Sequence, residues 1–141
     1  MSLFRSVFLD SESGSQLVWS ENLKAYEEDL ARLMDAGGPF SEVVEGYSDR
    51  PMQLEMAQAI ARAIVRCETF VAEAGTGTGK TFAYLVPALM WGGKVIISTG
   101  TRNLQDQLFF RDIPTVRKAL ASPVTVALLK GRSNYVCRLH L

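Results

Sequence analysis

The sequence is poor in cysteine and histidine, has no long apolar run and carries no net charge. Its two cysteines cannot form the disulfide framework that holds small secreted domains together. No apolar run approaches the ~20 residues that a transmembrane helix needs. The first ten residues contain one basic side chain and too short an apolar core for a secretory signal. Together these absences predict a cytoplasmic protein.

The charged residues are unevenly placed, although the 141-residue chain has an ordinary globular composition and suits one small domain or part of a larger one. From residue 10 to residue 49 the acids are Asp10, Glu12, Glu21, Glu27, Glu28, Asp29, Asp35, Glu42, Glu45 and Asp49, against Lys24 and Arg32. From residue 111 onward the bases are Arg111, Arg117, Lys118, Lys130, Arg132 and Arg138, against Asp112 alone. The C-terminal third could therefore contact a polyanion, but a solvated basic face explains its charge equally well.

The most informative stretch runs from Glu73 to Thr81 and contains glycine at every second position before Lys80. It follows a β-prone run at 69–72 and opens an apolar helical run at 82–86. A strand, a glycine-rich turn, Gly-Lys-Thr and a helix form the arrangement of a phosphate-binding loop. Ala74 stands where the usual pattern has its first glycine. The simpler alternative is a glycine-rich turn that only links strand to helix.

Each residue type in this loop has a role in phosphate chemistry. Glycines let successive backbone N–H groups point at phosphate oxygens, and the helix that starts near Gly79 adds its positive dipole end. Lys80 is expected to reach the β- and γ-phosphates, and the Thr81 hydroxyl is expected to bind Mg²⁺, which makes these two the catalytic candidates. The nucleotide-binding candidates are Ala74, Gly75, Thr76, Gly77, Thr78, Gly79, Lys80 and Thr81.

Apolar spacing and turn residues predict alternating helices and strands after an initial helical region. The predicted helices are 20–36, 39–46, one ending near Arg66, 80–90, 102–110 and 114–121; the predicted strands are 69–72, 94–98 and 124–129. Ser20 is the expected N-cap of the first helix, whose apolar stripe suits packing against the rest of the domain or a partner. Cys67 is expected to be a small core residue.

The alternation indicates an α/β fold with a parallel sheet. The nearly continuous apolar run at 94–98 indicates a strand that is buried on both faces. Ligand sites in such folds lie at the carboxyl ends of the strands. The phosphate loop and the polar turns at 98–101 and 130–135 all follow predicted strands, so we expect them on one rim.

Four motifs resemble, in order and spacing, those of the DinG/YoaA branch of superfamily-two DNA helicases, relatives of the XPD iron–sulfur helicases, with YoaA-type members the most similar. They are residues 73–81, 95–101, 104–108 and 129–135, the last followed by Cys137, and the resemblance covers about 38–141. It implies a RecA-like P-loop domain of an ATP-dependent DNA helicase. Such an enzyme couples ATP hydrolysis to movement along single-stranded DNA, to duplex unwinding and to DNA repair.

The resemblance also implies roles for residues outside the loop. Arg50 and Gln53 match the adenine-recognition motif, where an amide can both donate to and accept from the base edge. A polar helix start is the alternative for this pair. Thr99, Thr101 and Arg102 match the motif that contacts the backbone of single-stranded DNA. Capping of the following helix is a second role for Thr101, and both roles are compatible.

Cys137 matches the first of four cysteines that bind a 4Fe–4S cluster in this family, and one thiolate cannot hold a cluster. No acidic box follows Leu129, so no such carboxylate completes Mg²⁺ coordination. The resemblance therefore implies the N-terminal portion of a longer helicase. Residues 1–36 would be an extension, and 37–141 would be an incomplete first motor domain. We expect this chain alone to hydrolyse ATP poorly or not at all.

Two other functions remain compatible with the phosphate loop. The first is a P-loop ATPase or kinase that never acts on DNA. The second is a non-catalytic nucleotide-binding module that acts through the acidic helix 20–36. Cysteines and an acidic box in an adjoining reading frame would favour the helicase, whereas capture of a partner by residues 1–36 without ATP turnover would favour the module.

Overall fold

The computed structural model describes residues 22–48, 50–75, 77–131 and 134–135. Its principal helices are α2 (Leu23–Met34), α3 (Pro39–Val43), α4 (Pro51–Arg66), α5 (Lys80–Trp91), α6 (Arg102–Gln107), the π-helix η1 (Leu108–Asp112) and α7 (Ile113–Leu120). The predicted helices are thus confirmed, with shifts of a few residues at their ends. None of the helices in these ranges is long and apolar enough to cross a membrane.

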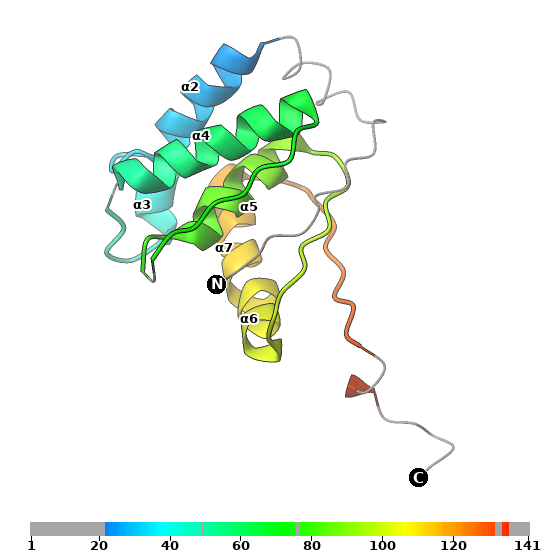
Figure 1. The fold of residues 1–141 in the computed structure, drawn as a ribbon. Coiled ribbons are helices and arrows are strands. Elements are labelled where there is room, and N and C mark those ends of the chain that lie inside the picture. The colour runs from blue at the N-terminus through cyan, green and yellow to red at the C-terminus, as the bar shows by residue number, and fades with distance from the viewer. Residues whose placement is uncertain (1–21, 49, 76, 132–133, 136–141) are drawn as a thin grey trace.

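Helix α2 begins later than expected and packs into the core beside α4 (Figure 1). Ser20 lies outside the described residues; Asn22 caps the helix, and its side-chain oxygen accepts a hydrogen bond from the Ala25 amide at 3.1 Å. Serine and asparagine are comparable caps, so the sequence pattern could not choose between them. The predicted apolar stripe is confirmed as packing surface, because Tyr26 and Leu30 are fully buried.

The core lies between α2, α4 and α5, with α3 and α7 closing its sides. Tyr26 connects α2 to α5, because its hydroxyl donates to the Pro87 carbonyl at 2.5 Å. Arg62 of α4 forms an ion pair with Glu27 of α2 at the edge of this core. The acidic helix is therefore fixed to α4 by an ion pair and to α5, the helix that follows the phosphate loop, by the hydrogen bond of Tyr26.

Helices α6, η1 and α7 follow one another without a break from residue 102 to residue 120. Pro114 lies inside this composite helix, where a proline has no N–H to donate and its ring crowds the carbonyl of the preceding turn. The wider π-helical turn just before Pro114 relieves that conflict. The expected boundary between two separate helices near Pro114 is therefore a change of helix type.

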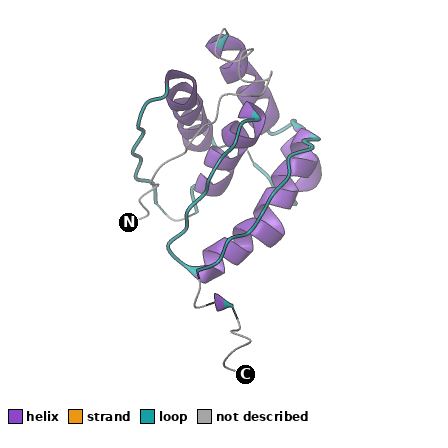
Figure 2. Ribbon diagram, turned by 90° about the vertical axis from the view of Figure 1, so that its right-hand side faces the viewer, coloured by secondary structure: helices purple, strands orange, loops and turns teal. Residues whose placement is uncertain are grey.

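The three predicted strands are extended segments, and no described residue belongs to a hydrogen-bonded strand (Figure 2). A cavity of about 900 Å³ is lined by both 94–99 and 124–129, and neither segment forms a strand ladder within the described residues. Side chains alternate along them, as in strands, with Val95 and Ile97 half-buried and Ile96 65% exposed. Burial on both faces, expected for 94–98, is wrong here, because helices cover one face alone.

Cys67 is exposed, and the prediction of a core position is wrong. The residue is the C-cap of α4 and has a left-handed backbone, with φ of 54°. Its amide and that of Glu68 donate to the carbonyls of the last helical turn. An apolar residue at the end of a helical run extends the pattern by one position, but the reversal of the chain turns this side chain outward.

Candidate nucleotide-binding site

The phosphate loop connects an extended segment to the first turn of α5, as predicted. Gly77 and Gly79 both have positive φ, at 77° and 78°, a conformation that side-chain-bearing residues rarely adopt. Gly79 is also the N-cap of α5, so the first backbone amides of that helix point toward the loop. Thr76 lies outside the described residues. Backbone geometry and helix position here match the requirements of an anion cradle.

Lys80 lies across the loop that it follows. Its Nζ donates to the carbonyl of Ala74 at 2.7 Å and to that of Gly75 at 2.5 Å. The Thr78 hydroxyl donates to the same Gly75 carbonyl at 2.9 Å. These bonds hold the ammonium group over the loop, where it can exchange carbonyl partners for phosphate oxygens.

Arg50 and Gln53 contact the phosphate loop from the start of α4. Arg50 Nη1 donates to the Gly77 carbonyl at 2.5 Å, and Gln53 Nε2 donates to the Gly79 carbonyl at 2.8 Å. Gln53 is only 4% exposed. A Cβ atom at Gly79 would be strained at φ 78° and would displace the Gln53 amide, so this position favours glycine. In the structure, Arg50 and Gln53 therefore both contact the phosphate loop, and their hydrogen bonds help to hold it in place.

Thr81 and Tyr84 connect the loop to the composite helix. Burial raises the pKa of Tyr84 to about 12, a hydrogen bond with Thr81 opposes this rise, and the Asp112 carboxylate adds to it. Asp112 is therefore close enough to Tyr84 to act on its ionisation. Thr81 therefore connects the start of α5 to Tyr84, one turn further along the helix.

A cavity of about 570 Å³ opens beside the loop. Four parts of the chain line it: the end of α3, Arg50, residues 77–82 and the composite helix. The composite helix contributes Gln107, Arg111, Asp112 and Thr115, and none of these was predicted from the sequence as a site residue. In the sequence, these residues are marked only by Asp112, the one acid among the bases from residue 111 onward. That pattern does not indicate which cavity Asp112 would line.

Thr99, Thr101 and Arg102 lie where the extended segment 94–99 leads into α6. The Thr99 hydroxyl donates to the Thr101 carbonyl at 3.2 Å, and the Thr101 hydroxyl accepts from the Leu104 amide at 3.3 Å. The expected capping role of Thr101 is thus confirmed. Arg102, the first residue of α6, is exposed.

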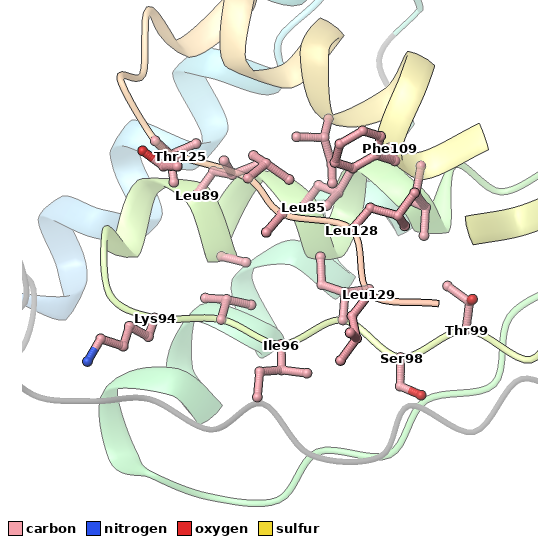
Figure 3. Close-up of a pocket in the computed structure, with 18 of the residues that line it drawn as sticks. Leu85, Leu89, Lys94, Ile96, Ser98, Thr99, Phe109, Thr125, Leu128 and Leu129 are labelled. Carbon is pink, nitrogen blue, oxygen red and sulfur yellow. The ribbon is translucent and has the colours of Figure 1, made fainter. Parts of the chain in front are cut away.

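Helix α6 connects the polar turn at 98–101 to the polar segment that begins at Lys130. Gln105 Nε2 donates to the Leu129 carbonyl at 3.0 Å, and Lys130 forms an ion pair with Asp106 at 2.9 Å. In Figure 3, Ser98 and Leu129 lie together at this end of the larger cavity. The phosphate loop opens on the smaller cavity, so the composite helix has one face toward each of them.

Metal-binding groups are sparse in the described ranges, which contain no cluster of three or more His, Cys, Asp or Glu side chains. Cys137 lies outside the described residues. Cys67 is a free, exposed thiol.

A glycine-rich loop that opens a helix beside a cavity with Lys80 and Thr81 on its wall defines a P-loop nucleotide-binding protein. The chain belongs to the DEAD/DEAH box helicase family, whose model matches residues 50–134. The helicase branch expected from the four motifs is confirmed by its relatives. No solved structure is significantly similar to the chain.

Its relatives include two helicases and a nuclease. The ATP-dependent DNA helicase YoaA of Haemophilus influenzae is 54% identical over 112 residues, which are 79% of this chain and 18% of that protein. YoaA of Escherichia coli is 56% identical over 100 residues, 71% of this chain and 16% of that protein. The 3'-5' exonuclease DinG of Bacillus subtilis is 42% identical over 101 residues, 69% of this chain and 11% of that protein. The chain thus spans less than a fifth of each of them.

Proposed function

We propose that the chain is the ATP-binding part of an ATP-dependent DNA helicase of the DinG/YoaA type. The observation that carries the proposal is the phosphate loop at the wall of the 570 Å³ cavity, with Lys80 held over it. Two of the relatives are named ATP-dependent DNA helicases. For this chain's protein we accordingly propose ATP hydrolysis that drives movement on single-stranded DNA. Residues 37–141 would be the N-terminal part of the motor domain, and 1–36 an extension. In the complete domain, the three extended segments would pair in a parallel sheet.

In this proposal the loop binds the phosphates of ATP. Backbone amides from Gly75 to Thr81 would donate to phosphate oxygens, helped by the positive end of α5. Lys80 would transfer its hydrogen bonds from the loop carbonyls to the β- and γ-phosphates. The Gln53 amide already donates to Gly79, and its Oε1 would remain able to accept from the adenine amino group.

Thr81 fits the metal expected in such a site. Thr81 lines the cavity, and Mg²⁺ takes few protein ligands when phosphate oxygens and water supply the rest. Bound Mg²⁺ would neutralise charge on the phosphates. No acid follows Asp112 in the sequence, so no later carboxylate of this chain can orient the attacking water. We therefore propose that the chain binds ATP but turns it over slowly or not at all.

A 4Fe–4S cluster is proposed for a longer protein only. It needs four thiolates, and this sequence has two cysteines, one of them exposed at the end of α4. The residues present do not fit the cluster by themselves. Cys137 would be its first ligand, with the others supplied from elsewhere.

Nucleotide binding is tested by isothermal titration of the purified chain with Mg²⁺–ATP. Lys80→Ala should weaken binding at least about tenfold, since it removes charge-assisted hydrogen bonds to phosphate. Lys118→Ala is the matched control, because Lys118 is exposed on α7 and does not line the cavity. Equal affinities of wild type and Lys80→Ala would overturn the assignment of the loop. DNA-stimulated ATPase activity that Lys80→Ala abolishes would instead overturn the proposed slow turnover.

Contact with single-stranded DNA is proposed for Thr99, Thr101 and Arg102. Support comes from the exposure of Arg102 and from the position of the two hydroxyls at the start of α6. Arg102→Gln should weaken binding of an unstructured oligonucleotide equally for all sequences. It should also reduce the salt dependence of binding by about one counterion. A sequence-selective loss, or none, would argue against the assignment.

A further inference from the structure

Arg111 is a third cation on the wall of the nucleotide cavity, after Arg50 and Lys80. Unlike those two, it is not bonded to the loop: its Nε donates to Asp112 Oδ1 at 2.8 Å. The side chain of Arg111 is 69% exposed. Within the described residues, Asp112 is the partner that the structure gives to this guanidinium. The terminal nitrogens of the guanidinium therefore keep N–H groups for another acceptor.

Asp112 is well suited to fix the direction of Arg111. It is one of two buried polar residues in the described part of the chain, at 4% exposure, and its Oδ2 accepts from Gln107 Nε2 at 2.8 Å. Hydrogen bonds in a π-helix join residues five apart, so the π-helical turn stacks Gln107 and Asp112 along one side. Burial of a carboxylate is costly unless its oxygens are bonded, and both are bonded here.

The charged side chains that line the cavity have a net positive charge, which favours an anion. Its cationic side chains are Arg50, Lys80 and Arg111, and its acids are Glu45 and Asp112. A guanidinium forms forked hydrogen bonds to phosphate oxygens, which a lysine cannot do. π-Helical turns within longer helices occur frequently at functional sites.

We propose that Arg111 binds the phosphate groups of the nucleotide, and that Asp112 is the positioning residue that holds it toward the cavity. The inference rests on the nucleotide binding proposed above for Glu73–Thr81. It adds a phosphate contact from the composite helix, which follows the loop and α5 in the sequence. It requires no change in the reaction itself.

The test compares Arg111→Gln with Lys118→Gln, which removes an equal charge from the same helical run outside the cavity. Titration with ATP should show about tenfold weaker binding for Arg111→Gln, about 1.4 kcal/mol, and no change for Lys118→Gln. Adenosine, which has no phosphate, should bind wild type and Arg111→Gln within about twofold of each other. Equal losses for ATP and adenosine would overturn the proposal, as would unchanged ATP binding with weaker binding of single-stranded DNA.

Asp112→Asn tests the positioning role, because the amide has nearly the same shape without the charge. It should weaken ATP binding several-fold in the wild-type background and have no further effect when combined with Arg111→Gln. Additive losses in the double variant would show that Asp112 acts independently of Arg111, and would overturn the positioning role. Circular dichroism of each variant separates these outcomes from unfolding.

Failure of this inference is distinguishable from failure of the proposed function. If wild type binds ATP, Lys80→Ala loses it and Arg111→Gln does not, only Arg111 is wrongly assigned. If wild type binds no ATP while its helical spectrum and cooperative unfolding are intact, the nucleotide site itself is wrong, and the role of Arg111 is overturned with it.

Discussion

Tyr26→Phe tests the connection between the acidic helix and the helix of the phosphate loop. Tyr26 is fully buried, and its hydroxyl donates to the Pro87 carbonyl at 2.5 Å. Phenylalanine keeps the ring and removes that bond, so the change isolates one polar contact. A buried neutral hydrogen bond contributes about 1 kcal/mol to stability, and we expect that loss at pH 7. Urea denaturation, followed by circular dichroism, measures it.

The pH dependence of the same variant provides a second, independent signature. Burial holds the pKa of Tyr26 well above its usual value of 10. The folded state therefore keeps the phenol proton at pH values where the unfolded chain loses it. The stability that Tyr26 contributes is complete below pH 10 and falls by about 1.4 kcal/mol per unit above it. Phenylalanine cannot ionise, so the gap between variant and wild type should close within about one unit above pH 10.

Tyr47→Phe is the matched control. Its hydroxyl also donates to a carbonyl of the helical layer, that of Met34 at 2.8 Å, but the bond is only partly buried. Water can replace it, so we expect a smaller loss at neutral pH. Equal stability of Tyr26→Phe and wild type at pH 7 would refute the reasoning. A gap that stays constant from pH 7 to 11 would refute the ionisation argument.

Three further changes test separate features. Gly79→Ala should destabilise the fold by at least about 1 kcal/mol, because φ is 78° and the added carbon meets Gln53, whereas Gly100→Ala, in open space, should be nearly neutral in the same urea experiment. Burial raises the pKa of Tyr84 to about 12, so wild type should lose stability from pH 10 to 12, and Tyr84→Phe should lack that share of the loss. Thr101→Ala should cost about 1 kcal/mol through the lost helix cap, and Thr101→Ser should restore it.

The phosphate loop and the helices were predictable because their signals are local. The spacing of glycines before Lys80 requires a turn with positive φ, and Gly77 and Gly79 have it. Apolar stripes at helical spacing correctly predicted the buried face of α2. End positions were less accurate, since Asn22 and the expected Ser20 are both good caps and only packing decides between them.

Features that depend on distant partners could not be read from local patterns. Cys67 continues an apolar run, but the left-handed cap of α4 exposes it. Pro114 indicates a helix start, yet the π-helical turn accommodates it inside a continuous helix. The cavity wall formed by Arg111 and Asp112 arises from that turn, and nothing in their immediate sequence reports it.

The predicted sheet illustrates the same limit for strands. Segments 94–99 and 124–129 show the side-chain alternation of strands, but pairing needs a neighbour at about 4.8 Å, and a 900 Å³ cavity lies where both meet the helices. Ile96 and Leu129 are 65% and 84% exposed on the uncovered face. The strand propensity of a segment depends on its own sequence, whereas a sheet forms only when several such segments lie side by side and pair.

The π-helical turn has a consequence for comparing this chain with its relatives. Such a turn holds one residue more than the α-helical turn it replaces, so in an alignment it corresponds to a one-residue insertion. A homologue with an uninterrupted α-helix should show a single gap within residues 108–112. Deleting one residue there would let the turn become α-helical, without rotating the preceding helix relative to α7. Gln107 and Asp112 would then be four positions apart, a spacing that keeps two side chains on one face of an α-helix.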